Sequence, residues 1–290
     1  MRHGAGMGAG EAPEERARPR FDVASVLRSA LDGRAAGAPI PTGFPTLDGL
    51  LGGGLRRGDL VVLAGDTGSG KSALALAIAL NVCAAGGSAA FLSGEMTAAR
   101  ILERALAMRG RVAIDDLRRG SLTDEAHAAA AAAALALRER APVLEDLRDA
   151  GLTGVSDLLA VHLGIEVTVV DPLQALALGR LPLDEEVAHA AHALKELSIR
   201  RSTAALVVSQ LAPSTSAPLS SRPQLHQLGA LGALQQHADV VLGLFREEMY
   251  GSHPDTEGAA ELHVLKNRNG PGGMVDLYFH REWLRFEEVA

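Results

Sequence analysis

Gly65-Asp66-Thr67-Gly68-Ser69-Gly70-Lys71-Ser72 is a glycine-rich stretch that fits the pattern G-x-x-x-x-G-K-[ST] at every required position. In this pattern the glycines let the backbone turn tightly, so that successive amide groups face a di- or triphosphate. Lys71 adds a mobile positive charge for the β- and γ-phosphates, and the Ser72 hydroxyl is a ligand for Mg²⁺. The sequence therefore predicts that all eight residues, 65–72, surround the phosphates of a bound nucleotide.

The segments on either side of the stretch are those that a phosphate-binding loop requires. Leu60 to Ala64 is a short apolar run, typical of a buried parallel strand, and Ala73 to Ala85 is an apolar stretch that favours a helix. Strand, loop and helix thus follow in the required order. A glycine-rich turn with an incidental lysine is the alternative, and it explains neither the full pattern nor its context.

Composition restricts the class of protein. The chain has 290 residues, of which 47% are hydrophobic and only 3% aromatic, so we expect a sizeable aliphatic core. Its net charge of −7 is not that of a protein that coats nucleic acid with its whole surface, so any DNA would be held at a local site. The single cysteine, Cys83, excludes a disulfide framework within the chain. With no apolar run long enough to cross a bilayer and no signal core, we expect a cytoplasmic protein without a membrane partner.

The chain divides into three predicted parts. Residues 1–20 mix Gly, Ala, Pro, Glu and Arg without an apolar period, which predicts a disordered tail. Residues 21–39 are predicted to form a helix, over 21–32, and a loop. The apolar residues of that helix recur at helical spacing: Val23, Val26, Leu27, Ala30 and Leu31. So short a helix needs a surface for its apolar stripe, on its own domain or on a neighbouring subunit. Residues 40–290 are predicted to form one large domain.

Strands and helices alternate through the first part of this domain, and strands follow one another at its end. Strands are predicted at 60–64, 89–92, 165–170, 204–208, 240–245, 261–265 and 274–279, and helices at 73–85, 97–109, 123–140, 153–163 and 183–201. This order predicts an α/β fold with a mostly parallel central sheet, flanked by helices, and late antiparallel strands at one edge. Residues 211–222 are rich in Pro, Ser and Thr and are expected to form an exposed, mobile loop.

Three polar side chains lie at the ends of predicted strands, where open parallel sheets bind their ligands. Asp171 has the position of the carboxylate that holds the Mg²⁺ water shell, although a turn or helix cap is the alternative. Glu95 is a candidate to orient the attacking water, and alternatively it only favours the N-terminus of its helix. Gln210 is a candidate sensor of the γ-phosphate.

Two cations follow a late strand, in the turn Lys266-Asn267-Arg268-Asn269-Gly270. A surface turn with two basic side chains is common, so by itself this pattern decides little. The functional interpretation is an arginine finger donated to the nucleotide of a neighbouring subunit, an effect typically worth about 10³ to 10⁵ in rate.

Seven segments are spaced along the large domain: Ile40–Asp48, Gly65–Ser72, Ser93–Met96, Val169–Gln174, Ser209–Leu211, Gln236–Val240 and Lys266–Pro271. In residues and in order they resemble the C-terminal motor domain of the replicative DnaB-type (superfamily 4) DNA helicases, over roughly residues 21–286. The resemblance implies a RecA-like fold, ATP hydrolysis with Mg²⁺, and a hexameric ring on single-stranded DNA with nucleotide between subunits. Residues 21–32 resemble that family's linker helix, which docks on the next subunit.

The resemblance also implies roles for the site residues. Those implied as catalytic are Lys71, Glu95, Gln210, Lys266 and Arg268, the last two acting in trans, and those implied as Mg²⁺-side groups are Ser72 and Asp171.

The chain departs from the family's pattern where DNA is expected. Ala212-Pro213 follow Ser-Gln-Leu, where the family usually has Asn-Arg, and residues 227–232 read Gln-Leu-Gly-Ala-Leu-Gly where it usually has Asp-Leu-Arg-Glu-Ser-Gly. The change removes an Arg and a Glu side chain. A backbone contact to DNA phosphate through Gly232 survives in principle, and Arg222 and Gly232 are the candidate DNA contacts. Nothing before Phe21 resembles that family's N-terminal helical domain.

Three functions follow from these observations. The first is an ATP-driven, ring-forming helicase motor in DNA replication or related DNA metabolism. The second is a RecA-like ATPase that assembles on binding ATP, as a switch or scaffold, without unwinding DNA. The third, a nucleotide-binding regulatory module without turnover, is disfavoured by the presence of Glu95, Asp171 and Arg268.

Overall fold

The computed structural model describes residues 37–148, 150–211, 222–251 and 256–289, and in addition Ala24 and Leu27, which are both helical. The predicted tail over 1–20, the rest of the predicted helix over 21–32 and most of the predicted loop over 211–222 therefore lie outside the described residues. The chain divides into two units, Met1–Ala38 and Pro39–Ala290.

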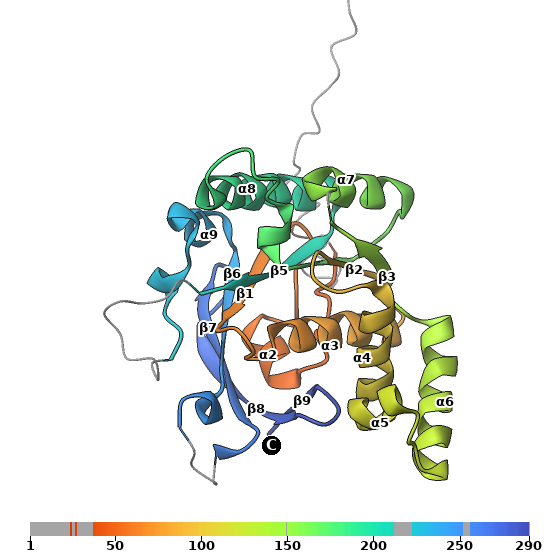
Figure 1. The fold of residues 1–290 in the computed structure, drawn as a ribbon. Helices are drawn as coiled ribbons and strands as arrows, with labels where there is room; N and C mark the ends of the chain where they lie inside the picture. The colour runs from red at the N-terminus through yellow and green to blue at the C-terminus, as the bar shows by residue number, and fades with distance from the viewer. Residues whose placement is uncertain are drawn as a thin grey trace, which may run out of the picture. The chain divides into compact units, whose positions relative to one another are not determined.

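The second unit alternates strands and helices and ends in strands (Figure 1). The described strands are β1 (Leu60–Gly65), β2 (Ala89–Ser93), β3 (Val143–Asp146), β4 (Val167–Asp171), β5 (Ala204–Gln210), β6 (Val240–Phe245), β7 (Ala259–Asn267), β8 (Gly273–His280) and β9 (Arg285–Glu288). The described α-helices are α2 (Pro45–Leu50), α3 (Lys71–Ala84), α4 (Ala98–Gly110), α5 (Ile114–Arg119), α6 (Asp124–Glu139), α7 (Gly151–Val161), α8 (Leu183–Arg201) and α9 (Ala233–His237). Short 3₁₀ turns lie at η1 (Leu173–Leu176), η2 (Leu225–Gln227), η3 (Ala230–Gly232) and η4 (Glu247–Met249).

The strands form one sheet in the order β3-β2-β4-β5-β1-β6-β7-β8-β9. The pairs from β3 to β6 are parallel, and β7, β8 and β9 are added antiparallel. The prediction of a mostly parallel sheet with late antiparallel edge strands is confirmed. Because β1 lies between β5 and β6, the loop that follows β1 opens at the middle of the sheet.

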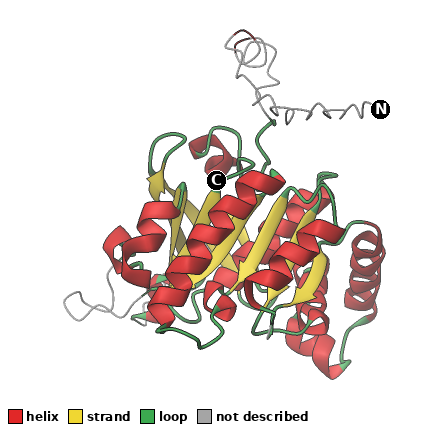
Figure 2. Ribbon diagram, turned by 90° about the horizontal axis from the view of Figure 1, so that it is seen from above, coloured by secondary structure: helices red, strands yellow, loops and turns green. Residues whose placement is uncertain are grey.

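Helices cover both faces of the sheet (Figure 2). In β1, Val61 and Leu63 pack in the cluster that contains α3, whereas Leu60 and Val62 pack in the cluster that contains α8. All four side chains are fully buried. Both faces of the parallel strands are thus covered, which explains why these strands read as continuous apolar runs rather than as alternating ones.

The helices and strands predicted for residues 40–290 are present, with boundaries displaced by up to two residues. Thr97 and Thr123 cap α4 and α6, because their hydroxyls accept hydrogen bonds from the backbone N–H groups of Arg100 and Ala126. The sequence did not predict β3, a half-buried strand of four residues at the edge of the sheet, where burial imposes little pattern. Among the described residues, no helix has the length and apolarity needed to span a membrane.

Candidate functional site

The glycine-rich loop joins β1 to α3 and turns over the N-terminus of that helix. Gly68 and Gly70 have φ of 83° and 101°, which side chains rarely adopt. A Cβ on Gly65 would lie 2.7 Å from the carbonyl oxygen of Leu244. The loop therefore needs glycine at these positions, and it presents its backbone to the first turn of a 14-residue helix. Such a helix N-terminus attracts phosphate.

The Lys71 side chain lies inside the curve of the loop. Its Nζ donates hydrogen bonds to the carbonyl oxygens of Gly65 at 2.9 Å and Asp66 at 2.8 Å. Burial lowers the pKa of Lys71, while the nearby carboxylates, Asp171 foremost, oppose that change. An ammonium group has three donors, so one remains for a phosphate oxygen.

Asp171 ends β4 beside Ser72, and the hydroxyl of Ser72 donates to Asp171 Oδ1 at 3.1 Å. Asp171 is only 1% exposed, and its Oδ2 has no hydrogen-bond partner. Burial raises the pKa of Asp171 to about 6; Glu95 also raises it, whereas Ser72, Arg104 and Lys71 lower it. A buried, unpartnered carboxylate oxygen next to a hydroxyl fits a small divalent cation, which prefers oxygen ligands. Mg²⁺ sites of this kind need only one or two carboxylates, because water and substrate phosphates complete the shell.

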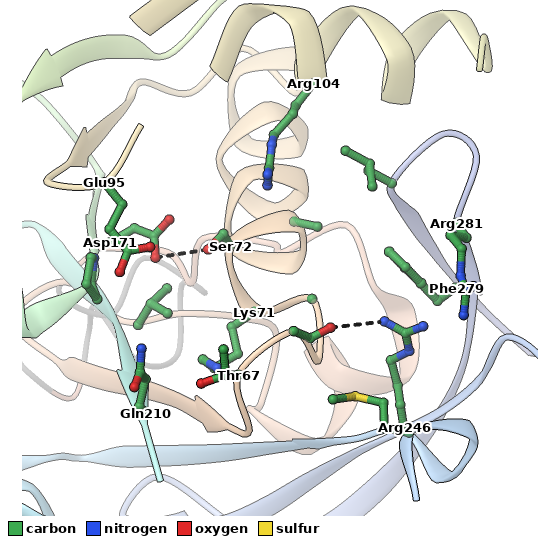
Figure 3. Close-up of a pocket in the computed structure, with 17 residues that line it drawn as sticks. Thr67, Lys71, Ser72, Glu95, Arg104, Asp171, Gln210, Arg246, Phe279 and Arg281 are labelled. Carbon is green, nitrogen blue, oxygen red and sulfur yellow. Dashed lines mark hydrogen bonds between the residues drawn. The ribbon is translucent and has the colours of Figure 1, made fainter. Parts of the chain in front are cut away.

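Glu95 and Gln210 enter the same pocket from neighbouring strand ends (Figure 3). Glu95 follows β2, and its side chain is exposed beside Asp171. Its backbone N–H donates to the Ser93 hydroxyl at 3.3 Å, which holds the turn. Gln210 ends β5 directly opposite Gly65 of β1. The structure thus brings together the predicted loop, Asp171, Glu95 and Gln210.

The pocket has a volume of about 480 Å³, within the range of small-molecule sites. Other residues that line it were not singled out from the sequence: Arg104, Val208, Arg246, Met249, Phe279, Arg281 and Leu284.

Arg246 is the most constrained of these residues. It is 5% exposed, lies 4.3 Å from the ring centre of Phe279 and pairs with Glu248. Its Nη1 donates to the carbonyl oxygen of Gly68 at 3.3 Å, so it braces the phosphate loop. The sequence could have indicated Arg246, because it directly follows β6. Ligands bind at the carboxyl ends of parallel strands, and Asp171 and Gln210 were predicted on the same ground.

Arg104 reaches the pocket from α4 (Figure 3). Its Nε is buried without a hydrogen-bond partner, and burial lowers the pKa of Arg104, with a further contribution from Arg118. An unpaired guanidinium N–H at this place suits an anion. Nothing in the local sequence of α4 distinguishes Arg104 from the other arginines of that helix.

Lys266 and Arg268 do not line this pocket. Because β7 is antiparallel to β6, Asn267 lies opposite Val240 at the start of β6, whereas the phosphate loop follows the end of β1. The six residues of β1 span about 17 Å, and this length separates the amino ends of the parallel strands from their carboxyl ends. Lys266 and Arg268 therefore lie near the amino ends of the parallel strands, whereas their own chain's phosphate loop lies at the carboxyl ends.

The two candidate DNA contacts lie on different segments, before η2 and at the end of η3. Arg222 donates two hydrogen bonds to the Glu261 carboxylate, at 2.7 and 2.6 Å, and stacks on Phe245 at the end of β6. Gly232 lies before α9, which leads into the start of β6. At Gly232 φ is 79°, an added Cβ would meet open space, and the residue is half-buried.

Comparison with known proteins gives consistent results. The family model of the DnaB-like helicase C-terminal domain matches residues 39–288. The replicative DNA helicase DnaB of Geobacillus stearothermophilus is 31% identical over 273 residues, which cover 92% of this chain and 59% of that protein. The replicative DNA helicase DnaC of Bacillus subtilis is 30% identical over 254 residues, covering 85% and 56%.

Solved structures show the same fold. A DnaB-like replicative helicase, whose structure was described with its interactions with primase, superposes with a TM-score of 0.81 at 22% identity, covering 93% of this chain and 67% of that one. The RadB recombinase superposes with a TM-score of 0.55 at 19% identity, covering 87% of this chain and all of that one. The RecA-like fold that the sequence resemblance implied is thereby confirmed.

This chain spans a little under three fifths of the length of the two curated relatives described above. The matched part is the one that contains the phosphate loop, the strand-end residues and the late cations. The chain belongs to the family of DnaB-like helicase C-terminal domains.

Proposed function

We propose that this chain is the ATP-hydrolysing motor of a ring-forming, DnaB-like DNA helicase that moves along single-stranded DNA in DNA replication or related DNA metabolism. The observation that supports it best is the separation of the two halves of the site. The pocket contains Lys71, Asp171 and Glu95, whereas Lys266 and Arg268 lie at the opposite edge of the sheet. Head-to-tail contacts in a closed ring would complete every such site with the next subunit's cations.

Within one subunit, each pocket residue has a task in hydrolysis. Lys71 and the loop amides bind the β- and γ-phosphates, and Glu95 orients the attacking water and accepts its proton. Ser72 and Asp171 would hold a Mg²⁺ ion, which supplies charge neutralisation between the phosphates. Gln210, opposite the first residue of the loop, is placed to respond to the γ-phosphate.

The trans role of Arg268 has a direct test. Lys71→Ala subunits have no working pocket but intact cations, and Arg268→Ala subunits have the reverse. Each should be nearly inactive alone, and mixed rings should recover hydrolysis at those interfaces that combine an intact pocket with intact cations. Absence of recovery in rings proven to be mixed would refute the trans assignment.

We further propose a hexamer, held in part by the predicted helix over residues 21–32, that works in the cytoplasm on single-stranded DNA. Gly232 would meet DNA phosphate through its backbone, and Arg222 would contribute only after leaving Glu261. ATP hydrolysis should rise when single-stranded DNA is added, strand displacement should accompany it, and both should weaken with salt as phosphate contacts are lost. Full hydrolysis that ignores DNA would refute the helicase.

A second candidate is an ATPase that assembles on ATP as a switch or scaffold. Two observations favour it: residues 227–232 contain no charged side chain, and Arg222 is engaged by Glu261. It predicts nucleotide-dependent oligomers in native mass spectrometry, together with no measurable DNA binding.

A further inference from the structure

The last carbonyl groups of α9 lie against the two cations at the end of β7. Lys266 Nζ donates to the carbonyl oxygens of Gln235, at 2.5 Å, and Ala238, at 2.7 Å. Arg268 Nη2 donates to the carbonyl oxygen of Gln236 at 2.8 Å. Carbonyl groups at a helix end have no partner within the helix and carry partial negative charge, so they attract cations.

Asp239, two residues after α9, completes this arrangement. Its Oδ1 accepts a hydrogen bond from Arg268 Nη1 at 3.1 Å. Its Oδ2 accepts from the backbone N–H of Leu60 at 2.8 Å and from Lys195 Nζ at 2.6 Å. Asp239 is 6% exposed, and both of its oxygens are in use. The carboxylate is therefore fixed against β1 and α8, and it transmits that fixed position to Arg268.

Neither cation exhausts its donors in these contacts. An ammonium group has three N–H bonds and a guanidinium group has five, and each uses two here. The Arg268 side chain is also 49% exposed. Its remaining donors are therefore accessible to an anion from outside the chain.

We propose that Asp239, with the carbonyl end of α9, is the positioning group for Lys266 and Arg268, and thereby controls hydrolysis in the neighbouring subunit's pocket. The inference rests on the proposed trans role of these cations. Both oxygens of Asp239 are occupied by contacts within its own chain, and Asp239 acts by confining Arg268. A free arginine side chain has many rotamers, and a displacement of about 1 Å at a reacting site can cost about 10²-fold in rate.

Asp239→Asn is the test, because the amide keeps an acceptor for the Leu60 N–H but loses the charge that holds Arg268. We expect its hydrolysis to fall about 10²-fold, while its own pocket binds a fluorescent ATP analogue as the wild type does. Asp59→Asn is the matched control. Asp59 accepts from Asn269 at 2.6 Å and lies 4.0 Å from Lys195, without a contact to Arg268. It should hydrolyse ATP near the wild-type rate.

Mixing separates positioning from a merely structural role. An Asp239→Asn subunit has a working pocket and misplaced cations, so Lys71→Ala subunits should restore it, and Arg268→Ala subunits should not. In a randomly mixed ring, about a quarter of the interfaces would pair a working pocket with working cations. Hydrolysis should accordingly rise at least tenfold over either variant alone.

Several outcomes would overturn the inference. Unimpaired hydrolysis by Asp239→Asn would do so, and so would an inactive variant that Lys71→Ala fails to restore. If Asp239→Asn does not fold, Lys195→Gln frees the other carboxylate oxygen and must join the same complementation group, with a smaller loss. If Lys71→Ala and Arg268→Ala restore each other, but Lys71→Ala restores neither Asp239→Asn nor Lys195→Gln, only the positioning role is refuted. When that reference pair fails too, the trans role fails with it.

Discussion

Asp171→Asn should make the free protein more stable while it abolishes hydrolysis. Asp171 is 1% exposed and one of its oxygens has no partner, so its ionised form is poorly solvated in the folded chain. Asparagine keeps an acceptor for the Ser72 hydroxyl and has no charge to bury. Replacing the Asp171 carboxylate should therefore remove the free energy cost of burying its negative charge in the protein without a bound cation.

The pKa of Asp171 gives the size and the direction of the pH-dependent change in folding stability. Burial raises it from 3.8 to about 6. Below pH 3.8 the group is protonated in both states, and the folded state bears no ionisation cost. As the pH rises to 6 the unfolded chain ionises first, so the folded wild type loses stability. Since one pKa unit is worth about 1.36 kcal/mol, the loss levels off at about 3 kcal/mol above pH 6. The variant escapes it.

Thermal unfolding with a chelator and without nucleotide measures this difference. At pH 8 the Tm of Asp171→Asn should exceed that of the wild type by about 6–12 °C for a domain of this size, and the gap should close toward pH 4. Asp157→Asn, whose side chain is exposed on α7, controls for the loss of one negative charge. A gap that is the same at both pH values, or a variant that is less stable at pH 8, would refute the reasoning.

Three further substitutions probe the pocket. Glu95→Gln should lower hydrolysis by at least about 10²-fold with unchanged affinity for a non-hydrolysable ATP analogue; a parallel loss of affinity would assign Glu95 to binding. Arg246→Ala removes the contact with Phe279 and the brace on the loop, so calorimetry should show about tenfold weaker analogue binding. Gly70→Ala would strain a φ of 101° and place Cβ 2.8 Å from Phe286, so urea titration should show about 2 kcal/mol lower stability.

Local patterns predicted those parts of the site that lie close together in the chain. The strand, the glycine loop and α3 are consecutive, and α3 is apolar on every side because the sheet lies on one side and α4 and β9 on the other. Asp171 and Gln210 were found because each follows a strand buried on both faces. The end of such a strand can be recognised in the sequence, and residues at the carboxyl ends of parallel strands lie where the sheet binds its ligands.

The remaining parts depend on strand order, which no local pattern contains. Arg246 lies 178 positions after Gly68, whose carbonyl it contacts, because β6 pairs with β1 rather than with β5. Arg104 reaches the pocket only because α4 passes above α3 (Figure 3). For Lys266 and Arg268 the sequence supplied a role by resemblance, and the antiparallel register of β7 supplies the physical reason that they cannot serve their own chain's pocket.

The short helix α9 connects two functions that the sequence treats as separate. It begins after Gly232, the proposed backbone contact to DNA, and its last carbonyls hold Lys266 and Arg268. Five residues span about 7.5 Å at the rise of an α-helix. Gln235 also donates to the carbonyl oxygen of Leu225 at 2.7 Å, which ties the helix to η2. If DNA displaces Gly232, a helix this short would pull on both cations, against the restraint that Asp239 places on Arg268. DNA held by one subunit would then act on the hydrolysis of its neighbour, without touching a nucleotide pocket itself.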